Sequence, residues 1–266
     1  MYKAIFTDLD GTLLDDKKNV SKENIEAIEK AIEKGAFVCV CSGRQIDITR
    51  TFKNNAHASN YMICSNGAII YDDLSHEVLF ASTVDQGFCK EVYEYVENNG
   101  MTARFDTRHG RFVNNNNYNV STEVLITEGI DEFLLENEVI QVSIAGDSFE
   151  KIDLAVNDLN IQNRATVKVE NRYHTTLPIE YYCINCINKN VSKGNAISGL
   201  CKYLKIDMKD VIGIGDELND ISMIEMAGLG VAMENALDEV KAVANEVTKT
   251  NTENGVAHII NKYILN

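Results

Sequence analysis

The amino-acid sequence predicts an α/β protein: a doubly wound parallel sheet with an inserted α+β domain. Short apolar runs alternate with amphipathic helical patterns in the first third of the chain and again after residue 188, and such alternation is typical of parallel sheets covered by helices. The stretch between these two parts has strand and helix patterns of its own. Acidic and small polar residues directly follow several apolar runs, at the strand ends where ligands bind in this fold class.

The first third of the chain predicts two strand–helix units and a third strand. Residues 3–7 form the first apolar run. Ser21 is a suitable N-cap for a helix whose isoleucines recur every three or four residues, and Gly35 ends that helix. Residues 36–41 form a continuous apolar run, as expected for a buried parallel strand. A second helix follows, and residues 61–64 form the next strand.

Residues 83–187 predict a separate α+β domain, so the core domain is expected to comprise residues 1–82 and 188–266. The inserted stretch predicts a helix marked by Phe88, Val92 and Val96, strands over residues 139–145, 165–169 and 179–184, and a helix over residues 148–159. The core pattern then resumes with a helix along apolar positions 196–204, a strand over residues 211–214, a helix over residues 218–227 and a strand over residues 229–233.

Composition narrows the classes of partner. The 266 residues include 25 Lys and Arg against 40 Asp and Glu, a formal net charge of −15. Nucleic acids and anionic membranes require a basic face, so neither is an expected partner, whereas one local positive pocket suffices for a small phosphorylated molecule. No apolar run approaches the length of a membrane span, and the first ten residues, with two aspartates, do not resemble a signal peptide. We expect a cytoplasmic protein.

The seven cysteines predict neither a disulfide scaffold nor a zinc site. Cys183 and Cys186 form a CxxC, but no second CxxC or pair of histidines accompanies it. Since the flanking residues alternate like a strand, the two thiols are expected on opposite faces. Reduced, structural cysteines are the simplest interpretation.

Two aspartates follow the first predicted strand. Asp8 and Asp10 are two residues apart, so they leave the strand on the same side. An Asp-Gly pair is often only a turn. Two acids at the end of a buried strand, however, raise the pKa of one another unless a cation lies between them. The motif therefore predicts a protonated carboxyl group, a bound metal ion, or both.

A second acidic segment, residues 213–220, follows another predicted strand. It is not a dinucleotide-binding loop, because Leu218 stands where the third glycine belongs, and it lacks the spacing of an EF-hand. Asn219 or Asp220 could serve only as a helix cap. Together with Asp216 and the first motif, the segment predicts a carboxylate cluster suited to a hard divalent cation, with Mg²⁺ as the first choice.

Two segments supply the complementary positive charge. Ser42, Gly43 and Arg44 follow the second predicted strand, where a hydroxyl and backbone N–H groups can bind an anion, although Ser42 alone could equally be a helix cap. Lys193 opens a helix, a position that opposes the helix dipole and that suggests function, although many lysines are simply solvated. Leu200 and Cys201 stand where a P-loop has Lys and Ser or Thr, so a P-loop NTPase is excluded.

These four segments, DLDGT, CSGR, VSKG and GDELND, resemble in order the four motifs of the haloacid dehalogenase superfamily of phosphatases. The Asn66-Gly67-Ala68 turn and the stretches NDISMIEMAG, VAMENA and NTENGVA resemble its Cof-type branch, which carries a class IIB α+β cap between the second and third motifs. Ser42 stands where many members have Thr, and either hydroxyl can donate to a phosphate.

The resemblance implies a role for each motif residue. Asp8 would be the nucleophile that forms an aspartyl phosphate, and Asp10 would protonate the leaving oxygen and then activate water. Mg²⁺ would be held by Asp8, the backbone carbonyl of Asp10 and Asp216, with Asn219 and Asp220 orienting these ligands directly or through water.

The remaining implied roles concern the substrate. Ser42 and Lys193 would hold the phosphoryl oxygens, and Gly43, Arg44 and Asn66 are candidates for substrate or phosphate contacts. Specificity would come from polar residues of the cap, which closes over the site. Its candidates are Arg108, His109 and Arg111, whose alternative interpretation is a solvated basic turn.

The expected function is therefore Mg²⁺-dependent hydrolysis of small phosphorylated metabolites, especially sugar phosphates. One alternative is a phosphomutase-type transferase on the same core, which would return the phosphoryl group to a sugar. Another is a non-catalytic sugar-phosphate-binding regulator, which the intact acidic motifs and Lys193 disfavour. A glycosidase also uses paired carboxylates, but it needs neither the lysine nor the metal.

Overall fold

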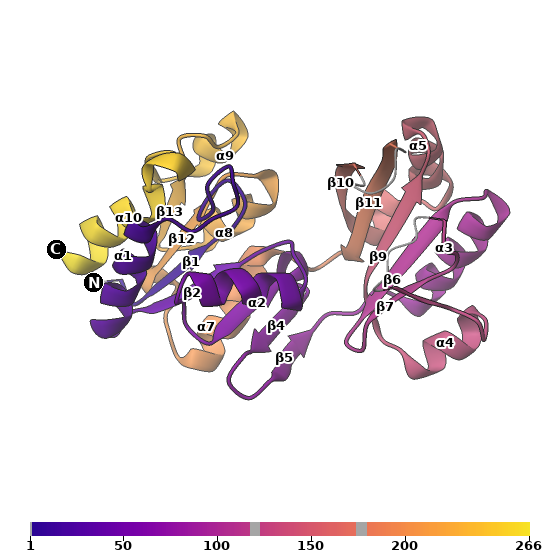
Figure 1. Ribbon diagram of the computed structural model, residues 1–266, viewed down its shortest axis with the longest axis horizontal. Coiled ribbons are helices and arrows are strands. Elements are labelled where there is room, and N and C mark those ends of the chain that lie inside the picture. Colours follow the sequence, from indigo (N-terminus) through magenta and orange to yellow (C-terminus); the bar gives the residue numbers. More distant parts are fainter. Residues whose placement is uncertain (1, 118–122, 174–179) are drawn as a thin grey trace. The chain divides into compact units, whose positions relative to one another are not determined.

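The computed structural model describes residues 2–117, 123–173 and 180–266, and the chain divides into two compact units (Figure 1). Unit 1 comprises Met1–Ala81 and Ser192–Asn266, and unit 2 comprises Ser82–Val191. No helix in the described part of the chain is both long enough and apolar enough to cross a membrane. That unit 2 acts as a cap stays a prediction.

Unit 1 has the predicted doubly wound sheet. In the described residues its strand order is β14-β13-β12-β1-β2-β3-β4-β5, and every pairing from β14 to β3 is parallel. The strands are β1 (Ala4–Thr7), β2 (Phe37–Cys41), β3 (Tyr61–Cys64), β4 (Ile69–Asp72), β5 (Glu77–Ala81), β12 (Val211–Gly215), β13 (Leu229–Ala232) and β14 (Glu246–Val247). The antiparallel strands β4 and β5 at one edge were not predicted from the sequence.

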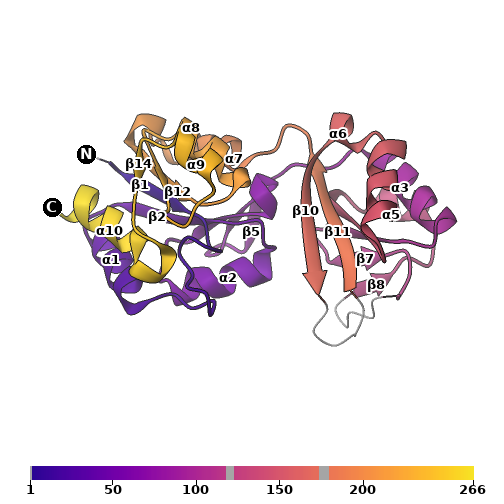
Figure 2. The ribbon, with the colours of Figure 1, turned by 90° about the horizontal axis from the view of Figure 1, so that it is seen from above.

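Helices cover both faces of this sheet, as Figure 2 shows. One face carries α1 (Lys22–Glu33), α2 (Ile46–Asn55) and α10 (Gly255–Ile260), and the other carries α7 (Lys193–Leu204) and α8 (Ile221–Met226). The predicted helix over residues 218–227 is instead a 3₁₀ turn, Leu218–Asp220, followed by α8. A further helix, α9, spans Asp238–Val243.

Local sequence signals set the ends of α1. The side chain of Ser21 accepts a hydrogen bond from the backbone N–H of Asn24 at 3.1 Å, which satisfies a free donor of the first turn. Gly35 has φ +87° just beyond the helix end, a conformation that costs glycine little. Both predicted ends are confirmed.

Unit 2 contains a mainly antiparallel sheet, with the order β10-β11-β9-β6-β7-β8 in the described residues. Its strands are β6 (Thr102–Thr107), β7 (Arg111–Val113), β8 (Glu123–Leu125), β9 (Val139–Gly146), β10 (Ala165–Tyr173) and β11 (Glu180–Asn188). Its helices are α3 (Gln86–Asn98), α4 (Ile130–Glu136), α5 (Phe149–Asp158) and α6 (Ile161–Arg164). The predicted strands over residues 165–169 and 179–184 are thus parts of longer strands, although residue 179 lies outside the described residues.

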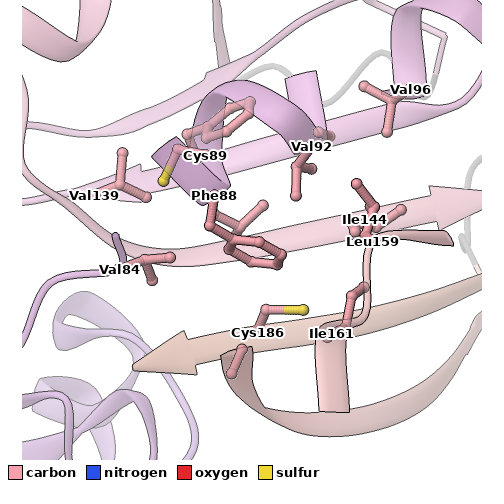
Figure 3. Close-up of a cluster of buried hydrophobic side chains, with 14 of the residues drawn as sticks. Val84, Phe88, Cys89, Val92, Val96, Val139, Ile144, Leu159, Ile161 and Cys186 are labelled. Carbon is pink, nitrogen blue, oxygen red and sulfur yellow. The ribbon is translucent and has the colours of Figure 1, made fainter. Parts of the chain in front are cut away.

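Unit 2 has its own hydrophobic core, shown in Figure 3. Phe88, Val92 and Val96, the predicted apolar positions of α3, face Ile144 of β9 and Cys186 of β11. Cys183 is also buried but lies outside this core, as the strand alternation predicts for the CxxC pair. All seven cysteines are buried and free of disulfides. Because the core is complete within unit 2, that unit is stabilised by its own packing.

Two adjacent leucines of α4 test this packing. Leu134 is 7% exposed and belongs to the core, whereas Leu135 is 86% exposed. Leu134→Ala should lower the free energy of unfolding by about 2–5 kcal/mol, because it removes buried methyl groups and leaves a cavity. Leu135→Ala, the matched control, should change it by less than about 0.5 kcal/mol. Urea unfolding followed by circular dichroism measures both, and equal losses would contradict the burial of α4.

Candidate active site

The predicted site residues follow neighbouring parallel strands. Strands β12, β1, β2 and β3 lie side by side in the sheet. Asp8 comes directly after β1, Ser42 directly after β2 and Asp216 directly after β12. Since the carboxyl ends of parallel strands meet at one edge, the sheet brings together groups that are more than 200 positions apart in the sequence.

Three buried carboxylates form a cluster at this edge. Asp8, Asp216 and Asp220 each place a carboxylate oxygen within 4.8 Å of the others. Lys193, fully buried at the start of α7, joins two of them. Its ammonium donates to Oδ1 of Asp8 at 2.5 Å and to Oδ1 of Asp220 at 2.6 Å. A buried ammonium without such partners would be strongly unfavourable, so the position of Lys193 depends on the carboxylates.

The charges of the cluster do not balance. With all groups ionised, three carboxylates and one ammonium leave two negative charges uncompensated. Burial raises the pKa of Asp8 to about 6, with Lys193 opposing and Asp220 adding to the rise. Burial also raises the pKa of Asp216 to about 7; the hydrogen bond from Thr12 opposes the rise, and the charges of Asp8 and Asp220 add to it.

The same excess of negative charge acts on the lysine. Burial lowers the pKa of Lys193, but the Asp220 and Asp8 carboxylates outweigh it and raise the pKa above its usual value. A divalent cation would neutralise the two excess charges, and carboxylate oxygens are the ligands that Mg²⁺ prefers. The residues present therefore fit a metal ion of this kind.

Asp220 is held by the loop in which it lies. Its Oδ2 accepts hydrogen bonds from the backbone N–H groups of Asp216 and Glu217 at 2.9 and 3.0 Å, while its Oδ1 accepts from Lys193. The Thr12 hydroxyl donates to Oδ1 of Asp216 at 2.6 Å. Asp220 thus uses both oxygens to orient the loop and Lys193, and Asp216 is fixed by a residue of the first motif.

The Asp10 side chain lies outside this cluster. Its Oδ2 accepts from Nε of Arg44 at 2.6 Å, and its Oδ1 accepts from Nη2 of Arg44 at 2.7 Å and from Nζ of Lys18 at 2.6 Å. Partial burial raises the pKa of Asp10, but these hydrogen bonds and the two positive charges outweigh it and lower the pKa to about 2. Asp10 is therefore a carboxylate at neutral pH in this structure.

The second motif is joined to the Asn66 turn. The Ser42 hydroxyl accepts from the backbone N–H of Arg44 at 3.1 Å, and the Ser42 carbonyl accepts from the N–H of Asn66 at 3.1 Å. The Asn66 side chain accepts from Nδ2 of Asn219 at 2.7 Å. A Cβ on Gly43 would lie 2.8 Å from Oδ1 of Asn66, so the glycine makes room for that side chain. Asn66 and Asn219 therefore bond to each other and join the second motif to the loop after β12.

The family follows from comparison with known proteins. The family model of haloacid dehalogenase-like hydrolases matches residues 5–260. The chain belongs to the haloacid dehalogenase (HAD) superfamily. It is 30% identical over 265 residues to the 5-amino-6-(5-phospho-D-ribitylamino)uracil phosphatase YcsE of Bacillus subtilis (strain 168), a match that covers 99% of this chain and 96% of YcsE.

Solved structures agree in fold. The crystal structure of TM0651 from Thermotoga maritima aligns with a TM-score of 0.82 and 26% identity, over 98% of this chain and 97% of that one. The HAD subclass IIB sugar phosphatase BT4131 aligns with a TM-score of 0.75 and 24% identity, over 98% of each chain. The predicted membership of the HAD superfamily is confirmed, and this HAD enzyme is a phosphatase.

Some residues of the HAD site were not singled out from the sequence. Thr12 lies inside the DLDGT motif, so its position was a signal that could have been used. Lys18 has no local signal, because its contact with Asp10 depends on how the chain turns between them. The contact of Gly67 with Ser192 likewise joins two distant segments.

The basic residues proposed for specificity lie at the β6–β7 turn of unit 2. Arg108 and His109 are exposed, and Nη2 of Arg108 lies 3.6 Å from a carboxylate oxygen of Glu138. Arg111 is the first residue of β7. Their role in specificity stays a prediction.

The Gly67 turn of this HAD phosphatase offers a test of the site's construction. Gly67 has φ +102°, and a Cβ there would lie 2.4 Å from the carbonyl oxygen of Ser192, next to Lys193. Gly67→Ala should therefore destabilise the protein and reduce phosphatase activity, because Ser192 and the buried Lys193 must shift. Gly35→Ala is the matched control, since Gly35 also has positive φ but no atom within 4 Å of the added Cβ.

Thermal unfolding and a phosphatase assay measure the two variants. In both variants, backbone strain should lower the free energy of unfolding by about 1–3 kcal/mol. Only Gly67→Ala should also lower the phosphatase activity beyond that shared effect. Equal activity in the two variants would contradict a functional role for the contact between Gly67 and Ser192.

Proposed function

We propose that this HAD phosphatase hydrolyses small phosphate monoesters, with phosphorylated sugars and sugar alcohols as its main substrates, through an aspartyl phosphate on Asp8. The observation that carries the proposal is the buried cluster in which Asp8 lies against Lys193 and beside Asp216 and Asp220. A nucleophile, a cation and two further acids at one strand edge suit phosphoryl transfer, which depends mainly on positioning and charge stabilisation.

The reaction has two balanced halves. In the first, a carboxylate oxygen of Asp8 bonds to phosphorus, the ester P–O bond breaks, and its electron pair stays on the leaving oxygen, which takes a proton from Asp10. In the second, water attacks the aspartyl phosphate and gives a proton to Asp10, while the P–O bond to Asp8 breaks and returns its electron pair to that carboxylate. The two halves leave Asp8 and Asp10 as they began.

The two halves require opposite protonation states of Asp10. The carboxylate held by Arg44 and Lys18 is the form that accepts a proton from water. Proton donation in the first half requires the protonated form. We therefore propose that Asp10 carries this proton on Oδ2, which accepts only one hydrogen bond from the two cations, so that Arg44 and Lys18 hold the group in both halves.

Other residues of the site would bind the phosphoryl group and the metal ion. The Lys193 ammonium and the Ser42 hydroxyl would hold the phosphoryl oxygens. Asp8, Asp216 and the backbone carbonyl of Asp10 would hold Mg²⁺, with Asp220 and Asn219 orienting them. When bound there, the cation neutralises excess negative charge and stabilises charge on the phosphoryl group.

The substrate class is supported by one relative and by the chemistry of unit 2. YcsE acts on a phosphorylated ribityl compound. In unit 2, six polar or charged side chains, buried or nearly so, form a hydrogen-bonded and ion-paired network: Arg104, Asp106, Glu123, Gln141, Ser143 and Asn185. Such a set of donors and acceptors suits the hydroxyl groups of a substrate. We propose that this network, in addition to Arg108, His109 and Arg111, selects the leaving group.

Removal of the metal ion tests the proposal that a divalent cation compensates the negative charge of the carboxylate cluster. Enzyme treated with EDTA should lose activity by at least about tenfold, because the cluster then keeps two uncompensated negative charges near an anionic substrate. Adding Mg²⁺ should restore activity, whereas Ca²⁺ should restore it poorly, because its coordination is looser than the octahedral arrangement of Mg²⁺. Full phosphatase activity in EDTA would refute the metal assignment.

Two substitutions separate the roles of the first-motif acids. Asp8→Asn should lower kcat by at least about a thousandfold on every substrate, since an amide is a poor nucleophile. Asp10→Asn should lower kcat by about 10²–10⁴ on esters with poor leaving groups, which need the proton, and by less on activated aryl phosphates. Assays with both ester types measure this, and equal losses for Asp10→Asn on all esters would remove the acid/base role.

The phosphomutase alternative is tested by the same assays. A hydrolase releases inorganic phosphate in step with ester loss and needs no bisphosphate activator. Phosphate release that falls far below ester loss in the presence of a second sugar would instead favour the transferase.

A further inference from the structure

Asp10 is bound by a pair of cations that reach it from different parts of unit 1. Arg44 lies between β2 and α2, and Lys18 lies between β1 and α1. Arg44 donates to both oxygens of the Asp10 carboxylate, a bidentate arrangement that fixes the plane of the group. Lys18 adds a third hydrogen bond, to Oδ1.

Counting acceptor positions identifies the oxygen left for chemistry. A carboxylate offers about four lone-pair positions, two on each oxygen. Arg44 and Lys18 use both positions on Oδ1, and Arg44 uses one on Oδ2. Within the described part of the chain, the remaining position is on Oδ2, and its direction is set by the guanidinium plane.

Both the backbone and the side chain of Arg44 are held in place. The backbone N–H donates to the Ser42 hydroxyl at 3.1 Å, and the carbonyl accepts from the N–H of Ser65 at 2.9 Å and from the Thr49 hydroxyl at 3.2 Å. Its guanidinium lies 4.9 Å from the centre of the Phe52 ring, a stacking contact open to arginine. A fixed donor can therefore aim the carboxylate that it binds.

Lys18 is placed by an unusual turn. It has φ +63°, a left-handed conformation that a lysine rarely adopts. The turn is closed by Asp15, whose Oδ1 accepts from the N–H groups of Lys17 at 2.9 Å and Asn19 at 2.8 Å. Glycine or asparagine would suit this backbone better, so the lysine breaks a local rule at the point where its ammonium meets Asp10.

We propose that Arg44 and Lys18 are positioning residues for the acid/base step: they orient the Asp10 carboxylate so that its proton transfers run through Oδ2. The inference rests on the proposed function, in which Asp10 gives one proton to the leaving oxygen and regains one from water. It assigns Arg44 to Asp10 in place of the phosphate or substrate contact that the sequence suggests. Because Lys18 is half-exposed, it contributes less than Arg44 to orienting the Asp10 carboxylate.

Arg44→Lys tests the geometry while the positive charge is kept. A lysine cannot form the bidentate pair, so Asp10 loses its fixed plane. A series of substituted phenyl phosphates, from p-nitrophenyl to p-methoxyphenyl, varies the leaving group with little change in shape. For Arg44→Lys, kcat should fall by about 10- to 100-fold on the poorest leaving group and by less than about twofold on p-nitrophenyl phosphate. Inhibition by inorganic phosphate should stay unchanged.

The chain provides a matched control. Asp73 is also bound by an arginine and a lysine, but with a single bond from the arginine: Nε of Arg50 donates to Oδ1 at 2.6 Å, and Nζ of Lys53 donates to Oδ2 at 2.7 Å. Arg50→Lys removes a comparable bond from the same unit and should leave the dependence on the leaving group as in the wild type. Lys18→Asn, which suits the left-handed backbone, is the second variant and should show the same leaving-group pattern as Arg44→Lys with a smaller amplitude.

The outcomes are distinct. Equal losses on all leaving groups, or weakened inhibition by inorganic phosphate, would make Arg44 a phosphate ligand and overturn the inference. The inference would also be overturned if kcat depended on the leaving group in both Arg44→Lys and Lys18→Asn as it does in the wild type. Wild-type enzyme without activity on any phosphate monoester, or an active Asp8→Asn variant, would instead refute the proposed function itself.

Discussion

The buried ammonium of Lys193 is the interaction on which the rest of the site depends. It lies between Asp8, directly after β1, and Asp220, from the loop after β12, and it has no exposed surface. A charge can be buried in this way only when carboxylates surround it. The ion pairs therefore fix the start of α7 relative to β1 and β12, and they place the proposed nucleophile beside a cation.

Charge also explains why the site calls for a metal ion. The chain carries a net charge of −15, and its carboxylate cluster exceeds its one lysine by two charges. A phosphate ester is itself an anion, so it would be repelled from this cluster unless a cation were present. Burial, with the charges of neighbouring aspartates adding to it, raises the pKa of Asp8 to about 6 and that of Asp216 to about 7.

Asp8 and Asp10 illustrate how one short motif produces two environments. Asp8 is buried and lies near Asp220, and both effects raise its pKa although Lys193 opposes them. Asp10, two residues later, meets Arg44 and Lys18, and its pKa falls to about 2. Neighbouring carboxyl groups with pKa values moved in opposite directions are a common basis for dividing chemical roles. Here the division comes from which distant cations each side chain reaches.

The sequence by itself determined the fold class, the alternation of strands and helices and the four motifs, and it predicted an inserted domain over residues 83–187. These features are local, since the period of apolar residues, the Ser21 cap and the Gly35 end act within a few positions. The edge strands β4 and β5 were not predicted, because their pairing depends on contacts across the sheet.

Only the tertiary structure decided which side chains of the site pair with one another. The pairing of Arg44 and Lys18 with Asp10, of Asn66 with Asn219 and of Thr12 with Asp216 joins segments between 8 and 204 positions apart. No local pattern specifies such contacts, because they arise where parallel strands end side by side. Residue types and their order predict which chemistry is available, and the geometry of the folded sheet edge determines which side chain each group meets.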